Sequence, residues 1–202
     1  MYQIILASES PRRKEIMEMM GIPFRAIASN VEETVQESEP DRLVEALAAL
    51  KAEHIFSNVE YEEREDQDSI IIGADTMVFY DGQALGKPQN EAEACKMLQM
   101  LSGSTHEVYT GVHIILWSAG KKQVITFAEC TRVFVQPMSM KQIEDYVATG
   151  EPMDKAGAYG IQGRFGIHIR GIEGDYYNVV GFPIAKIYEI LFTKGIDIKK
   201  LK

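Results

Sequence analysis

The sequence predicts a single α/β domain on a mixed sheet, with two lobes around a central cleft. Three observations support this fold class. Strand-like apolar runs alternate with helix-like segments, and the length of 202 residues exceeds one usual domain without reaching two. Hydrophobic residues make up 46% of the chain and charged residues 25%, which are ordinary globular values. We therefore expect a folded enzyme or binding domain covering residues 1–202.

The chain opens with an apolar run at residues 2–7, followed by Ser10 and Pro11. Serine is a favoured N-cap and proline is pre-set for the first helical turn, so strand, loop and helix are expected in that order. A second strand is predicted at residues 24–29, and a helix from residue 40 to about 56. The strongly acidic residues 58–69 predict a solvated loop.

A buried strand is expected at residues 70–72, ending at Gly73, with the chain reversing straight after Asp75. Residues 77–80 and 84–85 then predict a hairpin. The remaining predicted elements are, in order, a helix at 90–101, strands at 107–117 and 123–135, a helix at 139–149, a glycine-rich stretch of tight turns or close contacts at 157–174, and a final helix from residue 183.

Composition and charge exclude several classes of protein. A formal net charge of -9 argues against a broad nucleic-acid surface, which needs a basic stripe. Cys95 and Cys130 show no CxxC spacing and are interpreted as reduced packing residues. The N-terminal apolar run is too short for a signal peptide, and nowhere do eighteen apolar residues run together. We expect a cytoplasmic protein and, because most soluble oligomers are two-fold dimers, a homodimer.

The first chemical feature is the run Arg12-Arg13-Lys14 in the first turn of a predicted helix. A helix N-terminus carries partial positive charge, so three cations there should cost stability unless an anion is bound. A phosphate chain would accept hydrogen bonds from Ser8, Ser10, backbone N–H groups and an arginine fork. A solvated basic turn is the alternative, and no Walker glycine pattern decides between the two.

Asp75 is the second feature, because it follows a predicted buried strand. Ligands bind at the carboxyl ends of strands in open α/β sheets, where a carboxylate can hold a metal or take a proton from water. A turn-capping aspartate is the alternative. Glu32 and Glu33 offer a second carboxylate, Lys51 and Lys87 supply single cations, and two oxygen ligands plus substrate phosphates suit Mg²⁺.

The third feature is the segment at residues 151–163, which gathers an acid, a base, an amide and several glycines. Such a mixture is typical of a segment that lines a ligand-binding site. Gln162, between Ile161 and Gly163, offers both a donor and an acceptor to the edge of a base. A purely structural turn is the competing interpretation.

The chain contains, in order, the segments LASESPRRKEIM, GADTMV, GKP, MLQMLSGSTHEVYTGV, GEPMDKAGAYGIQGRFG and GDYYNVVGFPI. Together they span nearly the whole chain and resemble the Maf family of nucleotide pyrophosphatases. The resemblance implies hydrolysis of a nucleoside triphosphate to the monophosphate and pyrophosphate, with a divalent cation, Mg²⁺ or Mn²⁺. It also implies a fold similar to that of the inosine-triphosphate pyrophosphatases.

Position by position, the resemblance implies that Asp75 is the catalytic base and that Arg12, Thr76 and Gln162 select the substrate. Relatives acting on 7-methyl-GTP carry Trp, Gln and Glu at those three places, whereas this chain has the set of the dTTP and UTP enzymes. Further phosphate or metal contacts are implied for Ser8, Arg13, Glu33, Lys51 and Lys87, with Glu33 and Asp75 as the metal ligands. Two departures, the long acidic stretch and Phe165 in a usually glycine-rich segment, leave the motifs intact.

Two other functions are considered. The first is a nucleotide-binding regulator of cell division, since the family is named after inhibition of septum formation. The second is nucleic-acid binding, which the net charge disfavours. The sequence does not choose between dTTP, UTP and modified pyrimidine triphosphates, or between pool cleansing and division control.

Overall fold

The computed structural model describes residues 2–32, 34–58 and 68–201, and the chain divides into two compact units. The first unit comprises Met1–Asp75, Thr110–Glu129 and Gly181–Lys202, and the second comprises Thr76–Tyr109 and Cys130–Val180. The chain passes from one unit to the other within three long strands, and directly after Val180. The expected acidic loop lies largely at residues 59–67, outside the described residues.

A seven-stranded sheet has the order β2-β1-β3-β5-β6-β7, with β4 paired to β3. The pairs β1–β2 and β1–β3 are parallel, whereas β3–β4 and β6–β7 are antiparallel. This mixture confirms the predicted α/β class with a mixed sheet. The strand bounds are β1 Gln3–Ala7, β2 Arg25–Ala26, β3 Ser69–Tyr80, β4 Gln83–Leu85, β5 Thr105–Ser118, β6 Lys121–Val135 and β7 Ile169–Glu173.

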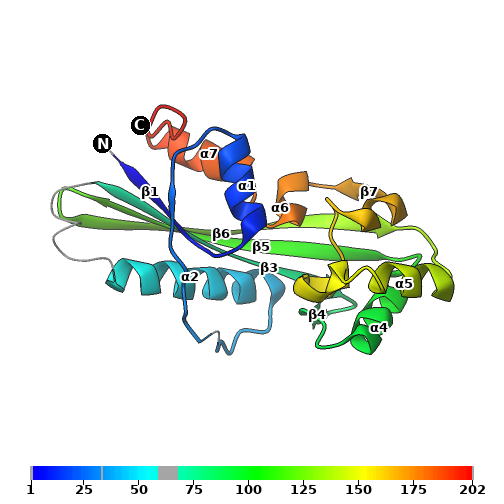
Figure 1. Cartoon of the computed structure of the whole chain (residues 1–202). Helices are drawn as coiled ribbons and strands as arrows, with labels where there is room; N and C mark the ends of the chain where they lie inside the picture. Colours follow the sequence, from blue (N-terminus) through cyan, green and yellow to red (C-terminus); the bar gives the residue numbers. More distant parts are fainter. Residues whose placement is uncertain (1, 33, 59–67, 202) are drawn as a thin grey trace. The chain divides into compact units, whose positions relative to one another are not determined.

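In the first unit, α2 (Pro40–Asn58) runs along one face of the strands, and α1 (Pro11–Met19) and α7 (Ile184–Thr193) lie on the other (Figure 1). Apolar side chains of the strands pack under α2. The buried members of this core cluster are Ile5, Ala7, Ala52, Ile55, Ile71 and Ile115. Burial of such side chains stabilises the unit by about 25 cal/mol for each Å² of apolar surface.

The second unit holds the remaining short helices around its own core. They are α4 (Glu91–Leu101), α5 (Met140–Val147), α6 (Tyr176–Val180) and three 3₁₀ turns, η1 (Glu151–Asp154), η2 (Ala156–Ala158) and η3 (Arg164–His168). Ser139 caps α5 through a complete capping box with Gln142, as a serine before an apolar helix favours. No helix in the described ranges is long and apolar enough to cross a membrane. The two cysteines are free thiols, as predicted.

One prediction about the central strand was wrong. The strand does not end at Gly73 and the chain does not reverse after Asp75, because β3 continues for 12 residues to Tyr80. Gly73 serves packing instead. A Cβ at Gly73 would overlap the carbonyl oxygen of Ala48, and one at Gly111 of β5 would overlap that of Val44, so both glycines let the backbone of α2 approach the sheet.

Smaller differences follow from tertiary contacts. The expected strand at residues 24–29 is reduced to the two residues of β2, which pair with β1. The glycine-rich stretch contains β7, an additional strand that alternation alone did not indicate and that pairs with β6 across a register shift at Phe134 and Val135. Ser10 stands at the N-cap of α1 but makes no side-chain cap bond, whereas Pro11 occupies the first helical turn as predicted.

Candidate active site

Asp75 lies within β3, on the face of the strand that α2 covers. Successive side chains of a strand alternate between its faces, so Ile71, Gly73 and Asp75 share one face. Ile71 belongs to the core under α2, and Gly73 gives the helix backbone room to come close. A carboxylate within a continuous strand does not cap a turn, so the alternative interpretation of Asp75 is excluded.

Lys51 projects from α2 onto this carboxylate. Its ammonium Nζ donates a hydrogen bond to Oδ1 of Asp75 at 2.5 Å, and the two side chains are 13% and 12% exposed. The sequence singled out each residue without indicating that they form a pair. A carboxylate has about four acceptor positions, so one ammonium donor leaves capacity for a water molecule or a cation. The pair therefore supplies a nearly buried, pre-oriented acceptor and a positive charge beside it.

The loop from Ser8 to Arg13 leads from β1 into α1 and is built around a buried guanidinium. Arg13 is 8% exposed, its Nε donates to the carbonyl oxygen of Gly181 at 2.8 Å, and its Nη1 donates to Oγ of Ser8 at 3.1 Å. The same Ser8 oxygen accepts the backbone N–H of Ser10 at 3.2 Å. A solvated basic turn does not bury its arginine, so the alternative interpretation of this loop does not hold for Arg13.

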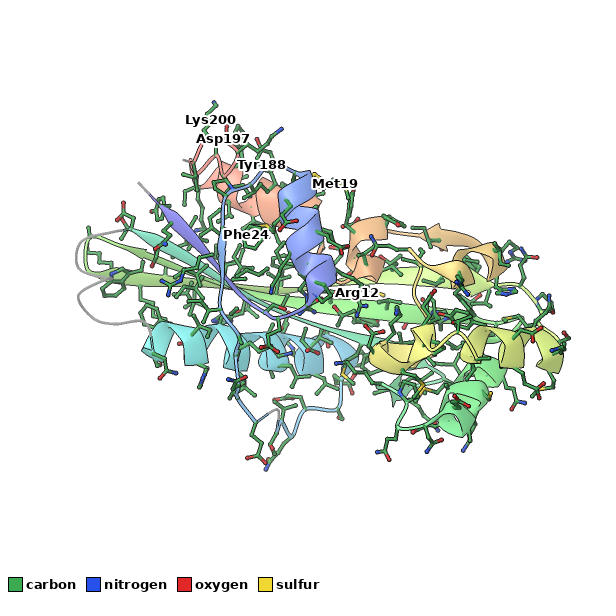
Figure 2. All side chains as sticks on the ribbon, in the orientation of Figure 1. Arg12, Met19, Phe24, Tyr188, Asp197 and Lys200 are labelled. Atoms are coloured by element: carbon green, nitrogen blue, oxygen red, sulfur yellow. The ribbon has the colours of Figure 1, made fainter. Side chains whose placement is uncertain are left out.

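Arg12, the next cation of this loop, differs from Arg13 in its setting. It is half-buried and lies at the first turn of α1, whereas Met19 lies at the far end of the helix (Figure 2). Neither Asp nor Glu stands in the first turn of α1, where acidic side chains would normally be favoured. The first turn of α1 therefore contains two arginines and no acidic residue, a composition that favours an anion at this helix end.

The second unit carries Thr76, Lys87 and Gln162. Thr76 follows Asp75 directly on β3, Lys87 is exposed between β4 and α4, and Gln162 is exposed in a turn before η3. The backbone N–H of Gly157 donates to the carbonyl of Gly86 at 3.0 Å, which ties the segment before Lys87 to η2. The GKP segment and the segment at residues 155–158, which are distant in sequence, are therefore linked by a backbone hydrogen bond within this unit.

Carboxylate ligands for a metal are few in the part of the chain that the structure describes. No group of three or more His, Cys, Asp or Glu side chains gathers there. The predicted ligand Glu33 lies outside the described residues. Mg²⁺ commonly uses one or two carboxylates together with substrate phosphates, so Asp75 alone is chemically compatible with a cation held partly by the substrate.

The order of these motifs agrees with a known family. Residues 3–193 match the family model described as Maf-like protein. The chain belongs to this Maf-like family. A Lachnoclostridium phytofermentans protein named dTTP/UTP pyrophosphatase is 49% identical over 201 residues, covering 99% of both chains. Relatives of the same name from Agathobacter rectalis and Bacillus cereus are 48% and 49% identical and are covered over 100% and 98% of their lengths.

A solved structure, that of the Staphylococcus aureus Ham1 protein, covers 66% of this Maf-like chain and 71% of the Ham1 chain, with a TM-score of 0.40 and 16% identity.

Sequence reasoning missed two features of the site. The first is the carbonyl of Gly181, which orients Arg13. In the sequence this contact is signalled only by the glycine within GDYYNVVGFPI, and the φ of Gly181, 114°, is a conformation that favours glycine. The second is the contact of Lys51 with Asp75, which depends on how closely α2 packs.

Proposed function

We propose that this Maf-like chain hydrolyses dTTP and UTP to the monophosphate and pyrophosphate. Identity of 48% to 49% over nearly the whole length to proteins named dTTP/UTP pyrophosphatase supports the substrate. The observation that carries the proposal is the nearly buried Asp75 carboxylate paired with Lys51. Such a group is suited to act as a general base in a water-poor site.

The proposed reaction is an in-line displacement at the α-phosphorus. Asp75 takes a proton from a water molecule, whose oxygen forms a bond to that phosphorus. The bond from the α-phosphorus to the bridging oxygen breaks, and pyrophosphate leaves with the bonding electrons. Lys51 beside Asp75 holds the carboxylate in place, while Arg13, Arg12 and Lys87 neutralise charge that gathers on the leaving group.

The proposal includes a divalent cation, Mg²⁺ or Mn²⁺, which when bound would neutralise the phosphates and polarise them for attack. Asp75 is the proposed ligand on β3, and Glu33 is proposed as the second carboxylate on the strength of the resemblance. Ser8 and Arg13 are proposed phosphate contacts because both are buried and mutually bonded. Arg12, Thr76 and Gln162 are proposed to select the pyrimidine base.

The decisive experiment measures pyrophosphate release from a panel of triphosphates with Mg²⁺. Wild type is expected to prefer dTTP and UTP. Asp75→Asn should bind dTTP yet turn it over at least about 10²-fold more slowly, the loss expected for a general base. Near-normal turnover by Asp75→Asn would overturn its role, and binding without monophosphate formation by wild type would favour a nucleotide-binding regulator instead.

The cellular setting belongs to the same proposal. The chain is proposed to act in the cytoplasm and as a homodimer. Cell fractionation tests the first statement, and light scattering coupled to size-exclusion chromatography tests the second.

A further inference from the structure

Glu151 organises the second unit's turn that carries Gln162. It is the first residue of η1, and two donors converge on its carboxylate. The hydroxyl of Tyr146 donates to Oε1 at 3.0 Å, and the backbone N–H of Arg164 donates to Oε2 at 3.1 Å. One side chain thereby connects α5 to Arg164, two residues after Gln162.

The backbone around Gln162 is shaped to receive this carboxylate. A Cβ at Gly163 would overlap both Oε1 and Cδ of Glu151, so a glycine is needed for the approach. The N–H of Gly163 donates to the carbonyl of Gly160 at 3.2 Å and closes the turn, with Gln162 inside it. The exposed amide therefore stands on a turn whose exit is bonded to Glu151.

Lys155 supports the entry of the same turn. Its Nζ donates to the carbonyl of Glu151 at 2.6 Å and to Oδ1 of Asp154 at 2.7 Å. A Cβ at Gly160 would lie 2.6 Å from Cε of this lysine, so the stem of Lys155 packs against the glycine backbone. Entry and exit of the turn thus both contact the η1 segment.

Aromatic rings fix the base of the turn. Phe165 is fully buried, with its ring centroid 4.9 Å from that of Tyr159 and 5.1 Å from that of Tyr146. Tyr146 therefore packs on the turn's anchor through its ring and bonds to Glu151 through its hydroxyl. The departure from the family pattern at Phe165 is explained as core formation under the turn.

We infer that Glu151 is a positioning residue for base selection, acting through Gln162 without contacting substrate. The inference rests on the proposed function, in which Gln162 selects the base. A side chain on a short turn discriminates between bases only if the backbone of the turn is held in one conformation. Each additional backbone conformation reduces the population of the one in which the side chain can bind the base. Glu151 supplies that restraint with two hydrogen bonds to a charged acceptor.

The test uses Glu151→Gln, which keeps the size of the side chain. Its amide oxygen can still accept the Arg164 N–H and its NH₂ can donate to the Tyr146 hydroxyl, but both bonds lose the charged acceptor that strengthens them. We expect the preference for dTTP over GTP, measured as the ratio of kcat/KM values, to fall about tenfold, the effect of weakening two bonds to a charged group. The change should lie mainly in KM for dTTP, because the reacting groups of the first unit are untouched.

A double variant separates positioning from general damage. In a Gln162→Ala background, Glu151→Gln should change the preference no further, because the side chain it positions is gone. Asp145→Asn is the matched control, since this exposed carboxylate of α5 pairs with Lys141 at 2.6 Å; it should leave the preference unchanged. An unaltered preference in Glu151→Gln, or an equal loss in both backgrounds, would overturn the inference.

Hydrogen exchange at the Arg164 amide gives a readout that needs no substrate. Glu151→Gln should raise its exchange rate, whereas Asp145→Asn should not, and unchanged protection would also overturn the inference. Failure of wild type to release pyrophosphate from dTTP would refute the proposed function itself. The two failures are therefore told apart by the wild-type assay and the amide measurement.

Discussion

The ammonium of Lys51 lies 2.5 Å from Oδ1 of Asp75, joining the middle of α2 to the middle of β3. This contact depends on two glycines, Gly73 and Gly111, over which the helix backbone rests. The pair is almost buried, so each charge has lost most of its water and relies on the other. Packing of the first unit and chemistry of its site are therefore coupled.

Removing the cation of this pair should cost both stability and activity. Lys51→Met retains the length of the stem but leaves the Asp75 carboxylate without its ammonium. We expect the free energy of unfolding to fall by about 1–3 kcal/mol in urea titrations, with turnover of dTTP reduced as well. In a double-mutant cycle with Asp75→Asn, the two losses in stability should not add. Strict additivity would show that the two charges do not interact.

Gly73→Ala tests the close approach of α2. The new methyl group would overlap the Ala48 carbonyl and lie 2.9 Å from Cβ of Ala52, so helix and strand must separate. Overpacking of this kind costs about 1–3 kcal/mol of unfolding free energy. Gly171→Ala is the control, because that strand glycine has nothing within 4 Å of its added Cβ. Equal stability of the two variants in urea would contradict the packing role of Gly73.

The guanidinium of Arg13 should not be replaceable by an ammonium. Its two bonds diverge to Gly181 and Ser8, and a lysine cannot make both from the same position. We expect Arg13→Lys to raise KM for dTTP about tenfold or more, from loss of the phosphate contact proposed for Arg13. Arg132→Lys, in an exposed ion pair with Glu173 at 3.0 Å, serves as the control and should leave KM unchanged. Equal KM values in all three proteins would argue against a phosphate role for Arg13.

Local patterns predicted most of the fold. The Ser-Pro start of α1 and the hairpin after Tyr80 each depend on residues near in sequence, so both followed from local patterns. Gly73 was misjudged because a glycine that ends a strand and one that admits a helix look alike in sequence. Only the position of Ala48 in space distinguishes the two.

The sequence indicated the residues proposed for the site but not the contacts between them. Arg13 was indicated because cations are costly at a helix start, and Asp75 because it follows a predicted buried strand, whereas Lys51 was noted only as a single cation. The partner of each was not predictable, since Lys51 meets Asp75 across 24 positions and Arg13 meets Gly181 across 168. Contacts over such separations depend on the packed fold rather than on local sequence.

His106 should make the stability of the protein depend on pH. Its side chain is buried in the second unit, 2% exposed, with Nε2 2.7 Å from the hydroxyl of Tyr159. Burial lowers the pKa of His106 to about 4, against about 6.5 in an unfolded chain. Between about pH 4 and 6.5, His106 is therefore protonated in the unfolded state but neutral in the folded state. The neutral imidazole's contribution is fully present above pH 6.5 and is lost as pH falls towards 4.

The His106→Gln protein isolates this contribution, because glutamine can still bond Tyr159 but does not titrate. Free energies of unfolding of both proteins would be compared at about pH 7.5, 5.5 and 4.5. Wild type should lose up to about 3 kcal/mol relative to His106→Gln over that range. Burial also lowers the pKa of His113, but His113 is present in both proteins and its effect cancels in the difference. A difference between the two proteins that stays constant with pH would mean that folding does not oppose protonation of His106.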